Sequence, residues 1–336
     1  MSNRQATIVI DAMGGEDSPY KILKGAEIFS NNHTEVSLKI FGDKSIILKT
    51  IENHRIYLND YDIIDCKENV LDDDNANTIL RSRKNSSIFK GLTYVKENSN
   101  SGFVSAGNTA AIMILSRLIL GMIQGVSRPA ICSNIPNKNS FSLMMDLGAN
   151  VYVNAENLLQ FALMGYSYFS IIDPTRNPKV GLINIGTENN KGLEFLQEAH
   201  DLISNSFLKK DFVGFIEPNK ITQGSCDIIL SDGYTGNIIL KTAEGLSDFI
   251  TSNLKNVFTK SLKNKIAYKI LDKDLKVFKN QIDPDEYNGA TLLGINGISV
   301  KSHGNANPYA FSCAINKCYD FILNDLNNKI IENFKS

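Results

Sequence analysis

The feature that most constrains the fold is a repeated unit in which a short buried strand ends in glycine and polar residues that open a helix. In the clearest copy, an apolar strand at residues 103–105 precedes Gly107, Asn108 and Thr109, and an apolar stretch of helical length follows at 110–123. Gly107 lets the backbone approach a ligand closely, and Asn108 or Thr109 can cap the helix. Free backbone N–H groups and the positive end of the helix dipole favour an anion there. The turn is therefore either an anion site or an ordinary strand-to-helix connection.

Two further copies keep the same order of strand, glycine, polar residues and helix. They are residues 179–204, with Gly186 and Lys191, and residues 226–238, with Gly236 and Asn237. Because parallel strands bring their carboxyl ends to one edge of a sheet, where α/β folds place ligands, we expect the three turns to meet. A lysine in the first turn of a helix opposes the helix dipole, so Lys191 is either a ligand-binding residue or an exposed surface lysine.

Strand and helix patterns alternate along the rest of the chain. This alternation predicts a doubly wound three-layer α/β/α sandwich around a mainly parallel sheet. In the first helix, Ser18 is the expected N-cap and Pro19 the expected first helical residue. No internal repeat or low-complexity linker marks a boundary, so residues 1–336 are expected to form a single α/β/α catalytic domain, built as two lobes of one sheet. Further strands are predicted at 6–10, 36–41, 61–64, 130–133, 141–145, 290–295 and 298–301, and further helices at 45–52, 154–168 and from 308 to about 327.

Residues 249–284 depart from this alternation. Their apolar residues recur at mostly three- and four-residue spacing, which predicts an amphipathic helix or helical pair that protrudes from the sheet. Eight lysines lie between positions 255 and 279. The apolar stripe either packs on another helix, commonly that of a second subunit, or lies in a membrane interface beside anionic lipid. The residues expected to make these contacts are Leu262, Ile266, Ile270 and Leu275.

Composition excludes several classes of protein. A chain of 336 residues with 43% hydrophobic and 21% charged residues is long enough for a substantial core, and its net charge of -1 argues against a general nucleic-acid binder. The most apolar window, 110–123, contains Arg117 and is shorter than the roughly 20 residues that a bilayer requires. The first residues lack the pattern of a signal peptide. We therefore expect a cytoplasmic protein whose cysteines, free of any CxxC pair, are small buried apolar residues.

Several common catalytic motifs are absent from the chain. There is no GxGxxG fingerprint, GxxxxGK[ST] loop, GxSxG elbow or HExxH pair. What remains is a set of neutral and cationic donors that suit a transfer in which the anion is itself the nucleophile, because phosphate near neutral pH needs positioning more than deprotonation. Each such donor stabilises a developing oxyanion by about 3 kcal/mol, and this chemistry needs no metal. The donors are Asn108, Asn237, Lys191, Arg128 and His303, with backbone N–H groups.

Eight stretches spread over the chain resemble the phosphate acyltransferases of phospholipid synthesis, the PlsX family. They are IDAMGGEDSP (10–19), RSRKNSS (81–87), FVSAGNTAAIM (103–113), GVSRPAI (125–131), MDLGANV (145–151), VGLINIGTENNKG (180–192), SDGYTGNIILKTAEG (231–245) and HGNANPYAF (303–311). The resemblance implies transfer of a long-chain fatty acyl group from acyl carrier protein to inorganic phosphate. The product would be acyl phosphate for phosphatidic acid and phospholipid synthesis, made without a cofactor.

The resemblance also implies partners and residue roles. It implies a homodimer in the cytoplasm that touches the inner face of the membrane beside the acyltransferase that consumes the product, and a fold like those of phosphotransacetylase and isopropylmalate dehydrogenase. Lys191 and Asn237 would be the catalytic donors. The residues that would bind phosphate and substrate are Gly107, Asn108, Thr109, Gly186, Gly236, His303 and Arg128.

Two other functions stay open at this point. One is a phosphate acetyl- or butyryltransferase that uses short acyl-CoA and has a similar fold, and the other is a non-enzymatic peripheral membrane scaffold. The chain also departs from the family pattern at Glu16 and Asp17, where a histidine is usual, and in the turns around Glu188 and Asn305.

Overall fold

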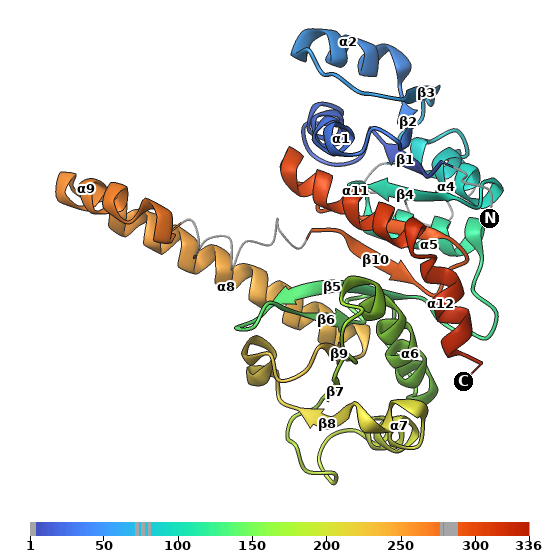
Figure 1. Cartoon of the computed structure of the whole chain (residues 1–336), viewed down its shortest axis with the longest axis vertical. Helices are drawn as coiled ribbons and strands as arrows, with labels where there is room; N and C mark the ends of the chain where they lie inside the picture. The colour runs from blue at the N-terminus through green and yellow to red at the C-terminus, as the bar shows by residue number, and fades with distance from the viewer. Residues whose placement is uncertain are drawn as a thin grey trace.

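The computed structural model describes residues 5–70, 74, 78–79, 82–275, 278 and 288–335. A single sheet of eleven strands runs through it in the order β3-β2-β1-β4-β11-β10-β5-β6-β9-β7-β8, and helices cover both faces (Figure 1). The strands are β1 (Thr7–Asp11), β2 (Ser37–Gly42), β3 (Tyr61–Asp65), β4 (Ser101–Ser105), β5 (Ala130–Pro136), β6 (Phe141–Met145), β7 (Val180–Ile183), β8 (Phe212–Ile216), β9 (Ile228–Leu230), β10 (Ala290–Leu293) and β11 (Ile298–Lys301). The helices are α1 (Tyr20–Asn32), α2 (Lys44–His54), α4 (Ser87–Glu97), α5 (Thr109–Leu120), α6 (Ala155–Ile172), α7 (Glu194–Ser204), α8 (Gly233–Thr259), α9 (Leu262–Ile270), α11 (Pro308–Leu323) and α12 (Leu326–Asn333), with 3₁₀ turns at Phe207–Lys210 and Pro218–Gln223.

The prediction of a three-layer α/β/α fold with a mainly parallel sheet is confirmed. Seven of the ten strand pairings are parallel, and the three antiparallel ones follow each other in the middle of the sheet, from β11 through β10 and β5 to β6. On one face, α1, α11, α6 and α12 cover the larger part of the core, and on the other α4, α5 and the beginning of α8 cover two smaller parts.

The three antiparallel pairings correct one expectation. Because the strand direction reverses three times between β4 and β9, these two strands run in opposite directions. Parallel strands end at the same edge of a sheet, so the turns after β7 and β9 lie at one edge. The turn after β4 lies at the opposite edge.

The helix boundaries differ from the expected ones at functionally relevant places. α1 begins at Tyr20, after Pro19, and no side chain caps it, because the Ser18 hydroxyl donates to the Gly14 carbonyl at 2.5 Å instead. α8 begins at Gly233, five residues before the expected start, because the Asp232 carboxylate caps it. β8 was not predicted, because its sequence FVGFI is a short apolar run without the alternation that marks a half-buried strand.

The helical region at 249–284 begins within helix α8, which follows strand β9. α8 runs for 27 residues from Gly233 and extends, with α9, away from the body of the molecule (Figure 1). α9 folds against the end of α8, where the rings of Phe258 and Tyr268 lie 5.6 Å apart. Leu262 and Ile270 are 76% and 77% exposed, and no residue of α9 is buried. Residues 276–277 and 279–284 of the expected protrusion lie outside the described residues. Within the described part of the chain, no helix is both long and apolar enough to cross a membrane.

Candidate functional site

Three turns follow the neighbouring strands β6, β9 and β7 and lie at one edge of the sheet. The register pairs Met145 and Leu182 with Leu230, so the three strands end side by side. This edge carries two of the three glycine-rich turns that the sequence singled out. It places Lys191 and Asn237 on adjacent connections.

A buried carboxylate, Asp146, organises the first of these turns. Its two oxygens accept hydrogen bonds from the backbone N–H groups of Ile131, Gly148, Ala149 and Asn150 at 2.7–3.3 Å, and from the Asn150 side-chain amide at 2.9 Å. Burial raises the pKa of the Asp146 carboxyl above its ordinary value, and these hydrogen bonds oppose that shift. Because all of these donors are committed to it, Asp146 is a structural anchor for the turn.

The first turns of α8 pack directly on this anchor. The Asp232 carboxylate accepts from the Thr235 backbone N–H at 2.8 Å, which caps the helix. A methyl group at Gly236 would lie 1.9 Å from the Asp146 carbonyl oxygen, so only glycine allows this approach. Asn237 is exposed one residue later and faces Gly148. Both Gly236 and Asn237 are therefore helical residues and not turn residues, contrary to the expected start of α8.

Lys191 lies in the connection between β7 and α7. Its Nζ is 2.7 Å from Glu188 Oε1, and its backbone carbonyl accepts from the Asn184 side-chain amide at 2.9 Å. The Lys191 ammonium holds the pKa of Glu188 below its ordinary value. The aliphatic part of Lys191 folds over Gly186, where an added methyl group would lie 2.6 Å from Lys191 Cδ. α7 begins only at Glu194, so the expectation that Lys191 opposes a helix dipole from the first turn is wrong.

Arg128 reaches the same edge from the opposite direction. It lies just before β5, which is antiparallel to β6, so the beginning of β5 meets the end of β6. The carbonyl of the next residue, Pro129, accepts from the Asn150 side-chain amide at 2.6 Å. Arg128 is exposed at this position.

The Gly107 turn belongs to a second cluster, at the ends of β1, β4 and β11. The Ser105 hydroxyl donates to the buried carboxylate of Asp11 at 2.6 Å and accepts from the Gly107 backbone N–H at 2.9 Å. A methyl group at Gly14 would lie 2.4 Å from the Gly107 nitrogen, so the two turns are in close contact. Burial raises the pKa of Asp11, against hydrogen bonds from Ser105 and Ser87.

Asn108 and Thr109 open helix α5 above this cluster. The Asn108 side-chain oxygen accepts from the Ala111 backbone N–H at 2.9 Å, so Asn108 is the N-cap. Thr109 is exposed, and it lines a small pocket beneath α5 together with Lys301. Lys301 in turn bonds the carbonyl of Ala106 at 3.4 Å.

His303 follows β11 in the same cluster. Its backbone N–H donates to the Asn288 side-chain oxygen at 3.1 Å. The next carbonyl, that of Gly304, accepts from the Glu16 backbone N–H at 2.8 Å. Desolvation by the surrounding protein lowers the pKa of His303, the charges of Lys301 and Lys241 lower it further, and the charge of Glu244 raises it.

Helix α8 runs from the first cluster toward the second. The two clusters lie toward opposite ends of β10, because Ala290 pairs with Lys301 whereas Leu293 pairs with Ala130. α8 begins at Gly233 in the first cluster, and its first twelve residues, to Glu244, span about 16 Å. Glu244 thereby comes within electrostatic reach of His303 in the second cluster.

Sequence reasoning missed three residues that hold these clusters together. Asp11, Asp146 and Lys301 each lie at, or one residue beyond, the end of a buried strand. A charged residue directly after an apolar run was the available signal, because such a side chain is buried only if it has partners.

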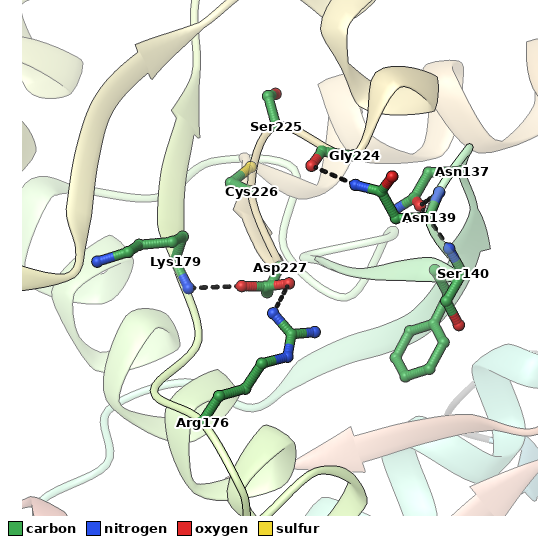
Figure 2. Close-up of a pocket in the computed structure, with 10 residues that line it drawn as sticks. Asn137, Asn139, Ser140, Arg176, Lys179, Gly224, Ser225, Cys226 and Asp227 are labelled. Carbon is green, nitrogen blue, oxygen red and sulfur yellow. Dashed lines mark hydrogen bonds and ion pairs between the residues drawn. The ribbon is translucent and has the colours of Figure 1, made fainter.

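A separate cavity of about 290 Å³ lies at the opposite ends of β7 and β9 (Figure 2). Arg176 Nη1 and the Lys179 backbone N–H converge on the Asp227 carboxylate at 2.7 and 2.8 Å. Arg176 also pairs with Asp173, and Lys179 with Asp211. Because its cations are neutralised and none of the predicted residues lines it, this cavity is not the site that the sequence indicates.

Comparison with known proteins decides the family. The profile described as fatty acid synthesis protein matches residues 6–329. A phosphate acyltransferase of Clostridium tetani is 38% identical over 325 residues, which are 97% of this chain and 97% of the relative. A phosphate acyltransferase of Wolbachia pipientis is 38% identical over 334 residues, covering 98% and 96% of the two chains. The chain belongs to the phosphate acyltransferase (PlsX) family.

Solved structures agree with the fold of this family member. A phosphotransacetylase from Streptococcus pyogenes superposes with a TM-score of 0.63 at 16% identity, over 95% of this chain and 94% of that one. The EutD phosphotransacetylase from Staphylococcus aureus gives 0.58 at 13% identity, over 97% and 94%. The predictions of the family, of an acyltransferase and of this fold are confirmed.

Proposed function

We propose that this phosphate acyltransferase transfers a long-chain fatty acyl group from acyl carrier protein to inorganic phosphate. The observation that carries the proposal is the donor set at the β6, β9 and β7 edge. Lys191, Asn237 and Arg128 lie there, while the nearby carboxylates Asp146 and Glu188 are already bound by partners. A site rich in donors and without a free base suits a nucleophile that brings its own negative charge.

In the proposed reaction a phosphate oxygen attacks the thioester carbonyl carbon. The C–O bond forms, the C–S bond breaks, and the proton of hydrogen phosphate goes to the departing thiolate, which leaves acyl phosphate and free carrier-protein thiol. Lys191 and Asn237 donate hydrogen bonds to the carbonyl oxygen as it becomes negative, which is where such donors accelerate acyl transfer most.

We assign the binding of phosphate to the second cluster and to Arg128 of the first. Gly107, Asn108 and Thr109 offer the N-terminus of α5 and His303 adds a side-chain donor, while Arg128 adds one from the end of β6. Gly186 and Gly236 contribute by leaving room for Lys191 and for the approach of α8. The transfer then takes place along the first turns of α8, between the two clusters.

The surroundings of Lys191 favour a long acyl chain over a short one. Apolar side chains with large exposed fractions surround the edge, and an acyl chain of many carbons buries such surface whereas an acetyl group does not. They are Val151, Tyr152, Ile185, Leu193, Tyr234 and Ile238.

The substrate assay compares two acyl donors. With phosphate present, we expect the protein to release thiol from palmitoyl acyl carrier protein at least tenfold faster than from acetyl-CoA at equal concentration. No release without phosphate is the accompanying control. Faster turnover of acetyl-CoA would establish the short-chain phosphate transferase instead.

The protruding helices suit a homodimer at the membrane. We propose that residues 1–336 act as one catalytic unit whose region 249–284 contacts a second copy and the inner face of the membrane, next to the acyltransferase that consumes acyl phosphate. The exposed Leu262, Ile266 and Ile270 and the half-buried Leu275 would form this contact, beside lysines that attract anionic lipid. The protein would be cytoplasmic and peripheral.

A further inference from the structure

The side chain of Asn184 lies buried one residue beyond the end of β7, where the connection that carries Lys191 begins. It is 3% exposed, and the Asn184 backbone N–H donates to the Ile216 carbonyl of β8 at 3.0 Å. A buried amide needs a partner for its donor and another for its acceptor, because an unpaired polar group inside a protein is unfavourable. The Asn184 amide has both partners, and both are backbone groups of this connection.

The Asn184 amide joins the two ends of the connection. Its Oδ1 accepts from the Ile185 backbone N–H at 2.8 Å, and its Nδ2 donates to the Lys191 carbonyl at 2.9 Å. Gly192 then packs against the amide with a φ of 87°, and a methyl group there would lie 2.0 Å from Asn184 Oδ1. Residues 185–190 therefore form a closed loop whose far end, at Lys191, is held on the end of β7.

The position of the Lys191 backbone matters because its side chain is half exposed. The Lys191 ammonium contacts Glu188 Oε1 at 2.7 Å, and an exposed ion pair of this kind holds a flexible side chain only weakly. The aliphatic stem of Lys191 lies over Gly186. Both of these contacts are made within the loop that Asn184 closes, so a change in the loop displaces the ammonium as well.

We propose that Asn184 is a positioning residue for Lys191, because its amide closes the loop and thereby holds the lysine ammonium at the end of β7. The catalytic task of that ammonium rests on the proposed function. Asn184 acts through the Lys191 carbonyl and needs no contact with the substrate. A donor that is held in place accelerates acyl transfer, and a displacement of about 1 Å lowers the rate up to about 100-fold. Loss of the amide is therefore expected to lower kcat and to leave the KM for phosphate nearly unchanged.

The direct test is a double-mutant cycle on the rate of acyl phosphate formation. Asn184→Ala is expected to lower kcat about 10- to 100-fold. In the Lys191→Ala background the same change is expected to lower kcat less than about twofold, because Lys191→Ala keeps the carbonyl and removes the ammonium. Equal reductions of kcat in the two backgrounds would overturn the proposal.

Two further variants show which property of Asn184 matters. Asn184→Asp keeps an acceptor for the Ile185 N–H but has no donor for the Lys191 carbonyl, so we expect a loss of kcat as large as in Asn184→Ala. A wild-type kcat in Asn184→Asp would overturn the role of the amide donor. The matched control is Asn137→Ala, which removes an asparagine that accepts from two backbone N–H groups of the β5–β6 connection, at the opposite edge of the sheet. This control is expected to keep the wild-type kcat.

A measurement without turnover separates this proposal from the proposed function. The Lys191 backbone N–H donates to the Glu188 carbonyl at 3.1 Å. We expect hydrogen exchange at this N–H to be at least about tenfold faster in Asn184→Ala than in wild type, while exchange within β7 stays as slow as in wild type. Unchanged exchange at Lys191 would overturn the anchoring by Asn184. Faster exchange together with wild-type activity of Lys191→Ala would refute the catalytic role of Lys191 in the proposed function and leave the anchoring intact.

Discussion

At the scale of single residues, two glycines of α8 distinguish the effect of close packing on stability from the effect of helix propensity. Gly236→Ala places a methyl group 1.9 Å from the Asp146 carbonyl oxygen, whereas Gly245→Ala meets no atom within 4 Å. We expect the first change to lower the free energy of unfolding by about 3 kcal/mol and the second to raise it by about 0.5–1 kcal/mol. Denaturant unfolding measures both. Equal stability of the two variants would mean that α8 does not rest on the Asp146 turn.

The ion pair of Lys191 with Glu188 makes a prediction about the rate of acyl transfer. Glu188 occupies the ammonium that the proposed reaction needs, and both side chains are about half exposed. Glu188→Gln removes the competing charge, so kcat is expected to rise about two- to fivefold, as suits an exposed ion pair. Steady-state kinetics at saturating phosphate measure this. A lower kcat in the variant would show that Glu188 orients Lys191 instead of competing for it.

Lys317 makes the free energy of unfolding depend on pH, and the direction of this dependence can be predicted. This residue of α11 is half-buried and donates to the Gly289 carbonyl at 2.8 Å, and desolvation of its ammonium group lowers its pKa from 10.5 to about 8. Between pH 8 and 10.5 the unfolded chain holds the extra proton, so this lysine makes stability rise with pH, by up to about 1.4 kcal/mol per pH unit. Below pH 8 both states are protonated and the contribution is constant.

The measurement for Lys317 is the unfolding free energy of wild type minus that of Lys317→Met. We expect this difference to be constant below pH 8 and to increase in favour of wild type from pH 8 toward 10. A difference that does not depend on pH would mean that Lys317 keeps an ordinary pKa in the folded protein.

At the scale of elements, α9 tests the role of the protrusion. Leu262→Glu with Ile270→Glu replaces two side chains that are each about three-quarters exposed and that no described residue buries. If they insert into a membrane interface, the affinity for vesicles of anionic phospholipid is expected to fall at least tenfold. The control is Asn256→Glu, which adds a charge to an exposed polar position on α8.

The same variants distinguish the two proposed contacts of the exposed apolar residues, with a membrane and with a second subunit. Loss of vesicle binding with an unchanged oligomeric state indicates the membrane, and dissociation of the protein in light scattering indicates a second subunit. Vesicle binding and assembly that both match the Asn256→Glu control would contradict the role of Leu262 and Ile270 in either contact.

The strands and helices that periodicity marks clearly were predictable, and their exact ends were not. The apolar runs of β1 and β6 and the cap of α5 at Asn108 follow from local sequence. The early start of α8 depends on Asp232 as a cap and on the space that Gly236 leaves against Asp146, which is a tertiary contact. β8 is a five-residue apolar run, FVGFI, of which only Phe215 and Ile216 are buried, and so short a run has no periodicity that identifies a strand.

At the scale of the whole molecule, the reversal of strand direction decides how the site is built. The sequence predicted three strand ends at one edge, and this holds for the ends of β7 and β9, which precede Lys191 and Asn237. The turn at Gly107 lies in the other half, because β10 and β5 reverse the direction between β11 and β6. Pairing between distant strands is not encoded in local pattern, so this arrangement could not be derived from the chain.

Helix α8 runs from the half of the sheet that carries Lys191 toward the half that carries the Gly107 turn. It begins on the Asp146 turn, includes Asn237, and carries Glu244 within electrostatic reach of His303 before it leaves the body of the molecule (Figure 1). A helix that begins in the first cluster and continues into the exposed protrusion connects the proposed transfer site with the proposed membrane contact. Its role follows from its position in the fold.

The central claim is that Lys191 and Asn237 act on a thioester carbonyl while phosphate attacks it. The most direct measurement is the rate of acyl phosphate formation from palmitoyl acyl carrier protein and phosphate, with the product trapped by hydroxylamine as the hydroxamate. We predict that Lys191→Ala and Asn237→Ala each lower this rate about 10²- to 10³-fold, while both variants unfold at the same denaturant concentration as wild type. Lys179→Ala, which changes a lysine of the separate cavity, is the matched control and is expected to keep the wild-type rate. Wild-type hydroxamate formation in both Lys191→Ala and Asn237→Ala would contradict the account.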